Sequence, residues 1–331
     1  MTDNKMSENN KQRSIVFFGT PEFAAHILDY LVSEKYNIAG VVTVPDRPAG
    51  RGHKMQPSAV KVVAESNNLP LLQPESLKDL KFVSSLQAWR AEIFVVVAFR
   101  MLPKIVWNMP ALGTFNLHAS LLPAYRGAAP INRAIQNGET RTGITTFLLD
   151  EEIDTGRILL QEEVNIEPVD NAGSLHNKLM NRGKFLVAKT IDGLFDGTIS
   201  DGIPQDPIAA AQAPFAPKIF KEDQLLSFTQ SNAESLLLTI RAMSPYPAAL
   251  AECEDEEGNS LQFKVYDAKI GDHVSNSAPG ICETDGKSFL RVIAADGKSV
   301  ELLELQPPSK KRMTIQAFLN GARKNLLLKF R

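Results

Sequence analysis

The sequence predicts an α/β protein in which a doubly wound, mostly parallel sheet is followed by a small antiparallel β-barrel. The first part of the chain contains continuous runs of Val, Ile and Phe separated by helical stretches, a pattern typical of a parallel sheet covered on both faces. A segment rich in Pro, Ala, Gly and Asp then interrupts this pattern. After it come short alternating strands separated by Gly and Asn turns, which are typical of a small barrel.

The expected elements of the first part follow from its apolar runs. The run IVFF (15–18) stops at Gly19, and the next three residues fit a helix start with Thr20 as N-cap, Pro21 in the first turn and Glu22 after it. The remaining pattern predicts strands at 38–44, 69–73, 92–99, 113–120, 142–149 and 156–166, and helices at 24–32 and 174–195.

The chain length and the changes in composition predict two domains. A chain of 331 residues is too long for one ordinary compact domain. The polar start, residues 1–13, is expected to be a disordered tail. The first domain is then expected at 14–197, a linker at 198–217 and the barrel domain at 218–331.

Charge, cysteine content and hydropathy exclude several classes of protein. The formal net charge is −2, so binding to a polyanion has to come from local basic patches rather than from the overall charge. The two cysteines, Cys253 and Cys282, are far apart and form no CxxC pair, so neither a disulfide scaffold nor a metal site is expected. No apolar run approaches the ~20 residues of a membrane span, and the start has no hydrophobic signal region. We therefore expect a cytoplasmic protein that does not bind membranes.

The first strand does not carry the dinucleotide fingerprint G-x-G-x-x-G, because Gly19 is followed by TPEF. A nicotinamide cofactor is therefore not expected, despite the doubly wound sheet. Ligands of open α/β sheets bind at the carboxyl ends of the strands, so the polar residues at those ends are the candidates for a site.

Three polar residues at predicted strand ends could act together on a carbonyl group. Asn116 and His118 alternate on one strand, so both side chains face the same side, and Asp154 follows in a turn after the next strand. An amide and an imidazolium can donate hydrogen bonds to an oxygen that becomes negative, while a carboxylate favours the charged imidazole and accepts protons from an attacking amine. The same residues also fit a satisfied core histidine, an asparagine that braces a loop and a solvated acidic turn, and spacing alone leaves these interpretations open.

Two basic clusters could bind a nucleic acid. The segment PDRPAGRGHKMQPSAVK (45–61) places several cations in a loop punctuated by glycine and proline, after the second strand, and a second cluster follows QPPS near the carboxyl end. Such loops can follow a phosphate backbone, although a solvated surface loop has the same composition. The nucleic-acid candidates are Arg47, Arg51, Lys54, Lys310 and Lys311.

Several longer motifs carry a resemblance to a known family. They are FFGTPEFAAHIL, PDRPAGRG, NLHASLLPAYRGAAPINRAIQNGE, TGITTFLLDEEIDTG, SPYP and LLELQPPSKKRM with AFLNG, which extend from about Ile15 to the end of the sequence. The central block, with N-x-H, SLLP and the later DTG, resembles the folate-dependent formyltransferases. PDRPAGRG and the carboxyl-terminal LQP-x-x-KK pattern are similar to the members of that superfamily that act on methionyl-tRNA. The sequence departs from the family pattern at Glu152, where a glycine is usual, and in VVVAFRMLP, which is one residue shorter than the common form.

The resemblance implies a reaction, two substrates and a set of site residues. It also implies that the carboxyl-terminal barrel is of the oligonucleotide-binding (OB) type and holds the tRNA. A formyl group would pass from 10-formyltetrahydrofolate to the α-amino group of methionine on initiator tRNA, in a monomer that needs no metal. The matching catalytic trio is Asn116, His118 and Asp154, and the arginine between two glycines, Arg51, would lie near the acceptor end of the tRNA. The residues expected at the folate are Arg100, Met101, Leu102, Ser120, Leu121, Leu122 and Pro123.

Other functions fit parts of this pattern. One is a formyltransferase that acts on a sugar-nucleotide amine or a purine precursor. The sugar enzymes are not expected to carry PDRPAGRGHK, and the purine enzymes lack the second domain. A second is a tRNA-binding protein without catalytic activity, against which the complete trio argues. A third is a folate hydrolase, in which water replaces the amine and the basic clusters have no purpose.

Overall fold

The computed structural model describes residues 12–49, 54–255, 257–321 and 328–331, and it divides into two compact units. Unit 1 contains the chain up to Gly127 together with Thr142–Val164 and Asn177–Phe215. Unit 2 contains Ala128–Arg141, Asn165–His176 and the chain from Ala216 onward. The chain therefore contributes to each unit in several separate segments. The domain boundaries predicted from composition remain a prediction.

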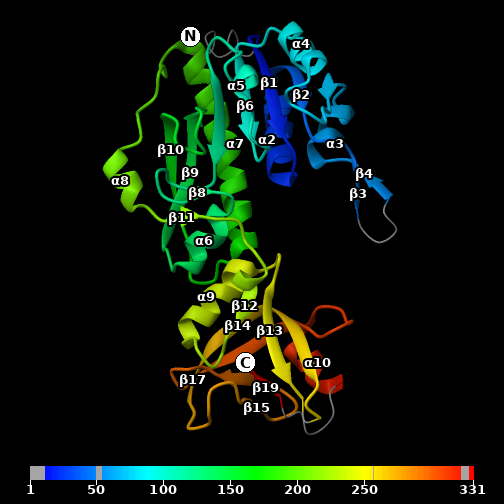
Figure 1. Cartoon of the computed structure of the whole chain (residues 1–331), viewed down its shortest axis with the longest axis vertical. Helices are drawn as coiled ribbons and strands as arrows, with labels where there is room; N and C mark the ends of the chain where they lie inside the picture. Colours follow the sequence, from blue (N-terminus) through cyan, green and yellow to red (C-terminus); the bar gives the residue numbers. More distant parts are fainter. Residues whose placement is uncertain (1–11, 50–53, 256, 322–327) are drawn as a thin grey trace. The chain divides into compact units, whose positions relative to one another are not determined.

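Unit 1 is built on one large sheet with the strand order β10-β9-β7-β6-β1-β2-β5 (Figure 1). β7, β6, β1, β2 and β5 run parallel, and β9 is antiparallel to β7. This confirms the predicted α/β class with a mostly parallel sheet. The strands are β1 (Ser14–Gly19), β2 (Asn37–Val42), β5 (Leu71–Leu72), β6 (Ile93–Val97), β7 (Thr114–His118), β9 (Arg141–Leu148) and β10 (Ile158–Asn165).

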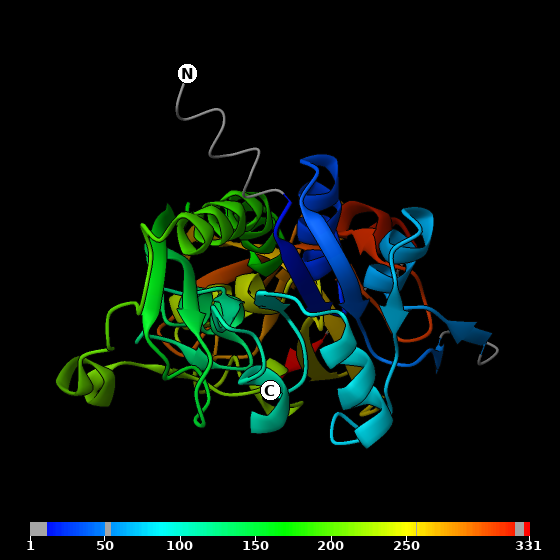
Figure 2. The same cartoon turned by 90° about the horizontal axis from the view of Figure 1, so that it is seen from above.

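Helices cover both faces of this sheet, as Figure 2 shows. On one face, Gly183 of α7 lies against Leu117 of β7 and Ile27 of α2, so the absence of a side chain allows these elements to approach closely. On the other face, Phe82 of α4 and Val106 of α5 belong to the same buried cluster as core residues of β1 and β6. The helices are α2 (Glu22–Ser33), α3 (Ala59–Ser66), α4 (Leu80–Ala88), α5 (Lys104–Trp107) and α7 (Ala172–Asp196).

The start of α2 differs from the sequence prediction. Pro21, not Thr20, is the N-cap residue, and no side chain caps the helix. The reason is that the first helical hydrogen bond already ends on Pro21, whose carbonyl accepts from the N–H of Ala25 at 3.0 Å. Pro21 also has no backbone N–H, so one fewer N–H group at the start of the helix needs a hydrogen-bond acceptor.

Unit 2 is rich in β-strands, most of them antiparallel, with the order β12-β13-β14-β17-β16-β15; β18 pairs with β17 and β19 with β13. A single bridge from Ile281 to Lys329 also links β19 to the start of β15. The apolar interior includes Phe228, Phe263 and Phe330, and the ring of Phe330 lies against each of the other two. The strands are β12 (Leu225–Leu226), β13 (Ala249–Glu254), β14 (Ser260–Val274), β15 (Cys282–Thr284), β16 (Leu290–Ile293), β17 (Lys298–Gln306), β18 (Met313–Thr314) and β19 (Lys329–Phe330).

The remaining elements are short or join the larger ones. In unit 2, α6 packs against α9, and Asn132 of α6 donates a hydrogen bond to the carbonyl of Ala242 in α9 at 2.7 Å. These elements are β3 (Arg47–Ala49), β4 (Lys54–Gln56), β8 (Arg126–Gly127), α6 (Pro130–Gln136), α8 (Pro207–Gln212), β11 (Phe215–Ala216), the 3₁₀ turn η1 (Glu222–Gln224), α9 (Ala233–Met243) and α10 (Ile315–Gly321).

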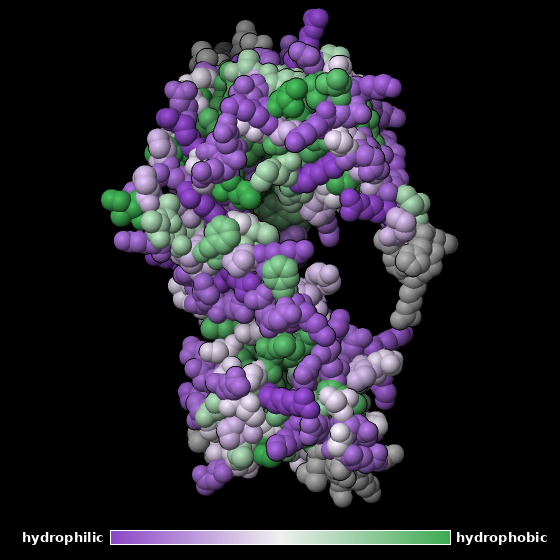
Figure 3. Space-filling view, in the orientation of Figure 1, coloured by the Kyte–Doolittle hydropathy of each residue, from purple (hydrophilic) through white to green (hydrophobic). Residues whose placement is uncertain are grey.

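The visible surface is mostly hydrophilic, and its apolar residues form small separate groups (Figure 3). Within the described ranges, every helix is too short or too polar to cross a bilayer.

Candidate active site and nucleic-acid interface

The end of β7 presents Asn116 and His118 on the same side of the sheet. Asn116 lies between Val96 of β6 and Phe147 of β9 in the strand pairing, and its side chain is partly exposed. Its amide makes no hydrogen bond with any residue that the structure describes, so its N–H donors are available to a ligand. His118, two residues later, is 6% exposed.

The surroundings of His118 fix the orientation of its ring. Nε2 lies 2.8 Å from the carbonyl oxygen of Tyr125, and the edge of the ring faces Phe147, with 6.5 Å between the ring centroids. Because a carbonyl oxygen only accepts hydrogen bonds, the hydrogen-bond network assigns a proton to Nε2. Nδ1 then faces the carboxylate of Asp154, with 3.7 Å between Nδ1 and Oδ2. A second proton on the ring would therefore lie on the side of Asp154.

The backbone of Asp154 is held in a turn that presents its carboxylate to His118. Its φ angle is +58°, in the left-handed region that Asp adopts more readily than most residues. Oδ2 also accepts a hydrogen bond from the backbone N–H of Gly127 at 2.9 Å. The sequence prediction that a tight turn holds this carboxylate agrees with this geometry, and the structure brings Asp154 next to His118.

Gln205 supports the Asp154 turn, and the sequence analysis did not identify it. Its side chain is 9% exposed, and Nε2 donates to the carbonyls of Asp154 at 2.9 Å and Gly156 at 2.8 Å. Its Oε1 accepts from Nη2 of Arg126 at 2.6 Å. Gln205 belongs to the segment 198–217, where composition alone predicts a linker. Only its tertiary contacts indicate a role at the site.

The SLLP loop (120–123), expected to form one wall of the folate site, is tied down from inside. The hydroxyl of Ser120 donates to the carbonyl of Ala124 at 2.6 Å, and the Thr145 hydroxyl donates to the carbonyl of Ser120 at 2.6 Å. Ser120 and Leu122 are buried, whereas Leu121 and Pro123 are partly exposed. A ligand on this loop would thus meet Leu121, Pro123 and backbone atoms.

A second part of the expected folate site follows β6, the strand next to β7. A groove of about 610 Å³ is lined by residues 75–78 and 100–104. Arg100 donates from Nη1 to the carbonyl of Glu75 at 2.8 Å, whereas its Nε is buried and has no hydrogen-bond partner in the described residues. Burial lowers the pKa of the Arg100 guanidinium, a shift that Glu75 opposes and Arg47 adds to. Met101 is exposed, and Leu102 is part of the core.

Two of the predicted nucleic-acid residues of unit 1, Arg47 and Lys54, belong to a small hairpin. β3 and β4 are antiparallel, and Arg47 at the start of β3 is exposed; Lys54 begins β4. Arg51 lies outside the described residues. The base of the hairpin is fixed because the carboxylate of Asp46 accepts from Nζ of Lys61 at 2.7 Å. This contact holds the start of β3, which is part of the basic segment 45–61.

The predicted nucleic-acid residues of unit 2, Lys310 and Lys311, are both exposed on the connection between β17 and β18. No ion pair joins either lysine to a described residue. They are therefore available to an anionic partner.

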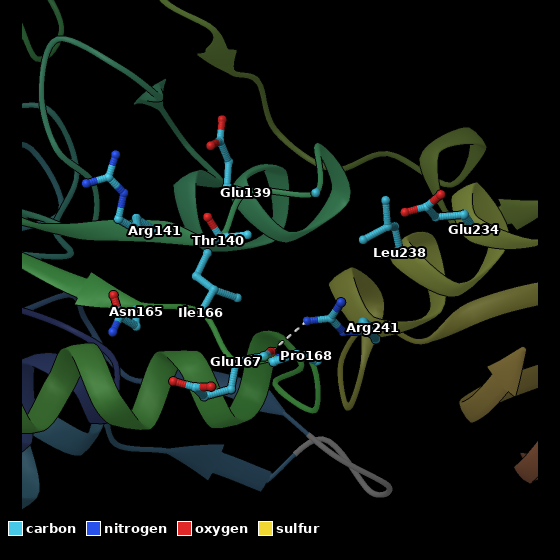
Figure 4. Close-up of a pocket in the computed structure, with 11 residues that line it drawn as sticks. Glu139, Thr140, Arg141, Asn165, Ile166, Glu167, Pro168, Glu234, Leu238 and Arg241 are labelled. Carbon is cyan, nitrogen blue, oxygen red and sulfur yellow. Dashed lines mark hydrogen bonds between the residues drawn. The ribbon is translucent and has the colours of Figure 1, made fainter.

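Unit 2 also contains a groove of about 570 Å³ that includes none of the predicted site residues (Figure 4). Arg241 of α9 points across it, and Nη2 donates to the carbonyl of Glu167 at 3.0 Å while Nε donates to that of Asp170 at 2.7 Å. Burial lowers the pKa of Arg241, and Asp170 opposes this shift. Arg241 thus braces α9 against the 167–170 segment. In the part of the chain that is described, no three His, Cys, Asp or Glu residues are grouped as metal ligands.

Comparison with known proteins gives consistent matches along most of the chain. Residues 12–191 match the formyl transferase family, and residues 218–323 match the family of the formyl transferase C-terminal domain. A methionyl-tRNA formyltransferase from Bacteroides fragilis is 50% identical over 308 residues, which cover 93% of this chain and 94% of the relative. Another from Flavobacterium johnsoniae is 48% identical over 307 residues, covering 93% and 95%.

Solved structures share the fold at low sequence identity. WlaRD, a sugar 3N-formyl transferase crystallised in the presence of dTDP and 5-N-formyl-THF, has a TM-score of 0.64 and 18% identity, with coverage of 90% of this chain and 99% of that one. HypX from Aquifex aeolicus in complex with tetrahydrofolic acid has a TM-score of 0.62 and 14% identity, covering 96% of this chain and 50% of that one. At these identities the two structures support the fold alone.

Proposed function

Because the chain belongs to the methionyl-tRNA formyltransferase family, we propose that it transfers the formyl group of 10-formyltetrahydrofolate to the α-amino group of methionyl initiator tRNA. The observation that carries this proposal is the approach of Asp154 to His118 at the carboxyl end of β7, the strand on which Asn116 lies two residues before His118. The product would be formylmethionyl-tRNA, which serves in the initiation of translation. We expect the protein to act as a monomer in the cytoplasm.

The reaction is a direct transfer with no covalent enzyme intermediate. A bond forms between the amine nitrogen and the formyl carbon, the bond from that carbon to N10 of the folate breaks, the amine loses a proton and N10 gains one. The formyl oxygen becomes negative during the attack, and a donor aimed at it lowers the barrier. Asn116 is suited to this role because its amide bonds to none of the residues that the structure describes.

Next to this donor, Asp154 would accept a proton and His118 would supply positive charge. Asp154 faces Nδ1 of His118 at 3.7 Å and can receive a proton from the attacking amine, directly or through water. His118 keeps its Nε2 proton on the carbonyl of Tyr125. The imidazolium then adds a positive charge near the developing oxyanion, and its Nδ1–H, the N–H that is not bonded to Tyr125, is the one that can donate to that oxygen.

The residues present fit a folate, which would supply the activated formyl group when bound. Arg100 offers a buried Nε that bonds to no residue in the described ranges, the kind of donor that a polar ligand group satisfies. Its neighbours Met101 and Leu102 line the same groove. The braced SLLP loop adds Leu121, Pro123 and backbone atoms, so a ligand would bind there at little ordering cost. Ser120 and Leu122 would act by shaping this loop.

Basic residues of both units would bind the phosphate backbone of the tRNA. We assign Arg47, Arg51 and Lys54 of unit 1 to the acceptor end, and Lys310 and Lys311 of unit 2 to a second contact. Lys and Arg side chains that neutralise phosphates provide most of the affinity of such complexes and make it depend on salt. This arrangement gives a chain of net charge −2 two local basic sites.

The test is a formyl-transfer assay with a radiolabelled formyl donor. Charged Met-tRNA, UDP-amino-arabinose and glycinamide ribonucleotide are offered separately. Label in Met-tRNA alone supports the proposal. Label in another amine, or release of free formate without any labelled amine, would overturn the substrate assignment.

A further inference from the structure

The turn between β17 and β18 carries three consecutive cations, and the structure separates them into two kinds. Arg312 is engaged within the protein: its guanidinium lies 4.2 Å from the centroid of the Tyr266 ring and is paired with Glu304. Lys310 and Lys311 have no ion-pair partner in the described residues and extend into solvent. The two lysines are therefore free to bind an anion, whereas Arg312 anchors the turn.

A chain of side-chain hydrogen bonds fixes the shape of this turn. Gln306, the last residue of β17, donates from Nε2 to the carbonyl of Lys310 at 2.8 Å. Its Oε1 accepts from the hydroxyl of Tyr266 at 2.9 Å. Because the Lys310 carbonyl can only accept a hydrogen bond, the NH₂ group of Gln306 must face it. The side-chain oxygen of Gln306 is then directed to the hydroxyl of Tyr266. Both ends of the amide are satisfied, so the Lys310 backbone is tied to the sheet.

Tyr266 is the extra residue of a β-bulge. In the pairing of β14 with β17, Val265 is opposite Leu305 and Asp267 is opposite Glu304, so Tyr266 has no partner in the register. Bulges of this kind change the direction of a side chain and occur next to functional sites. The turn itself also contains a non-glycine residue in the left-handed region, Ser309, with a φ of +59°. Such a conformation persists only where the surrounding contacts enforce it.

We propose that Tyr266 and Gln306 are positioning residues that hold the 307–312 turn so that Lys310 and Lys311 bind adjacent phosphates of an RNA backbone together. The inference rests on the proposed tRNA substrate. A flexible turn would carry the same two charges, but it would lose conformational entropy when it binds RNA. A turn that is already ordered loses less, so its affinity for RNA is higher. The contribution of Tyr266 and Gln306 is thus expected in the affinity for RNA and not in the chemical step.

The test is a double-mutant cycle measured with a fluorescently labelled initiator tRNA and no formyl donor. Tyr266→Phe removes only the hydroxyl and keeps the ring under Arg312. We expect it to weaken tRNA binding ~3–10-fold, as for the loss of one hydrogen bond. In a Lys310→Ala/Lys311→Ala background the same substitution should change the dissociation constant less than ~2-fold, because the groups that it positions are gone. Gln306→Met should behave like Tyr266→Phe.

The matched control is Tyr246→Phe, because Tyr246 is 83% exposed and its hydroxyl has no hydrogen-bond partner in the described residues. This variant should bind tRNA as the unmodified protein does. Equal weakening by Tyr266→Phe in both backgrounds would overturn the inference, as would unchanged binding by both Tyr266→Phe and Gln306→Met. In the transfer assay, kcat should be unchanged and KM for tRNA raised, whereas a loss of kcat with KM unchanged would indicate a merely structural role.

The two proposals fail in different ways. If the unmodified protein transfers formyl to Met-tRNA and the cycle shows additive effects, only the inference about Tyr266 and Gln306 is wrong. If it binds tRNA without formylating it, the proposed function is wrong, and the cycle still decides whether these residues position the lysines. If it binds no tRNA, both are wrong.

Discussion

The carboxylate of Asp154 lies 3.7 Å from Nδ1 of His118, on the opposite side of the ring from the carbonyl of Tyr125 that holds Nε2. The imidazole is thus placed between an acceptor that fixes its orientation and a carboxylate that can exchange a proton. Asn116, two residues before His118, adds on the same side of the sheet an amide that has no bond within the described part of the chain. The predictions below test these roles separately.

Loss of the carboxylate or the imidazole should stop catalysis and leave tRNA binding nearly intact. We expect Asp154→Ala and His118→Ala each to lower kcat more than about 100-fold, the usual effect of removing a proton-transfer or charge-stabilising group. Single-turnover formyl transfer and tRNA binding are to be measured in parallel. Glu151→Gln is the control, since this exposed carboxylate pairs with Lys104 and not with His118. Near-normal turnover of Asp154→Ala would refute the assignment.

Asn116 should matter for the chemical step and hardly for stability. Asn116→Ala removes a partly exposed amide that bonds to no described residue, so the free energy of unfolding should change by less than about 0.5 kcal/mol. Removal of an oxyanion donor should lower kcat about 10²–10³-fold. Turnover and denaturant unfolding of the same preparation check both statements. A variant with full turnover would show that another group stabilises the oxyanion.

Gln205 should affect the site by way of the Asp154 turn. Gln205→Ala leaves the carbonyls of Asp154 and Gly156 without their donor, which should cost about 1–3 kcal/mol of stability and lower kcat about 10-fold through misplacement of Asp154. The KM for tRNA should not change. Gln212→Ala, in exposed α8, is the control. If both substitutions leave kcat unchanged, the turn does not need Gln205.

The basic segment 45–61 of unit 1 should contribute to the salt dependence of tRNA binding. Arg51→Ala should weaken the use of tRNA and reduce the slope of log K against log salt concentration by about 1, because one phosphate contact is lost. Titrations of tRNA at several salt concentrations measure the slope. Arg157→Ala is a suitable control, since this side chain already donates to the carbonyl of Gly202. An unchanged slope for Arg51→Ala would rule out a phosphate contact.

The two cysteines of unit 2 should be unreactive in the folded protein. Burial raises the pKa of both Cys253 and Cys282 to about 12, from an ordinary value of 9.0. At pH 8 a thiol reagent should therefore label neither residue until the protein is unfolded. Since the folded-state pKa values are raised, the stabilisation is complete below pH 9 and is lost as the pH rises toward about 12. A Cys253→Ala/Cys282→Ala variant should then lose less stability than the parent between pH 9 and 11. Labelling of the native protein at pH 8 would contradict this prediction.

The sequence predicts the parts of the structure that depend on local patterns. Continuous apolar runs identify the central strands, and alternation alone places Asn116 and His118 on one side of β7. The bond from His118 to the carbonyl of Tyr125 could not be predicted, because a backbone oxygen leaves no trace in the residue type. The bond from Gln205 to Asp154 joins residues 51 positions apart. The predicted N-cap of α2, Thr20, was wrong by one residue. Thr20 and Pro21 both suit a helix start, and only the backbone conformation decides between them.

The interleaved course of the chain constrains how this protein can be cut or recombined. α6 belongs to unit 2 although it precedes much of unit 1 in the sequence. A gene fragment that begins at residue 218 would omit α6 and remove the partners of two groups in unit 2. The carbonyl of Ala242 would lose its hydrogen bond from Asn132, and the carboxylate of Asp223 would lose Arg133, which lies 2.9 Å away. The face of α9 that packs on α6 would then meet water. Chimeras joined at this point between relatives should be built with α6 and α9 from the same parent.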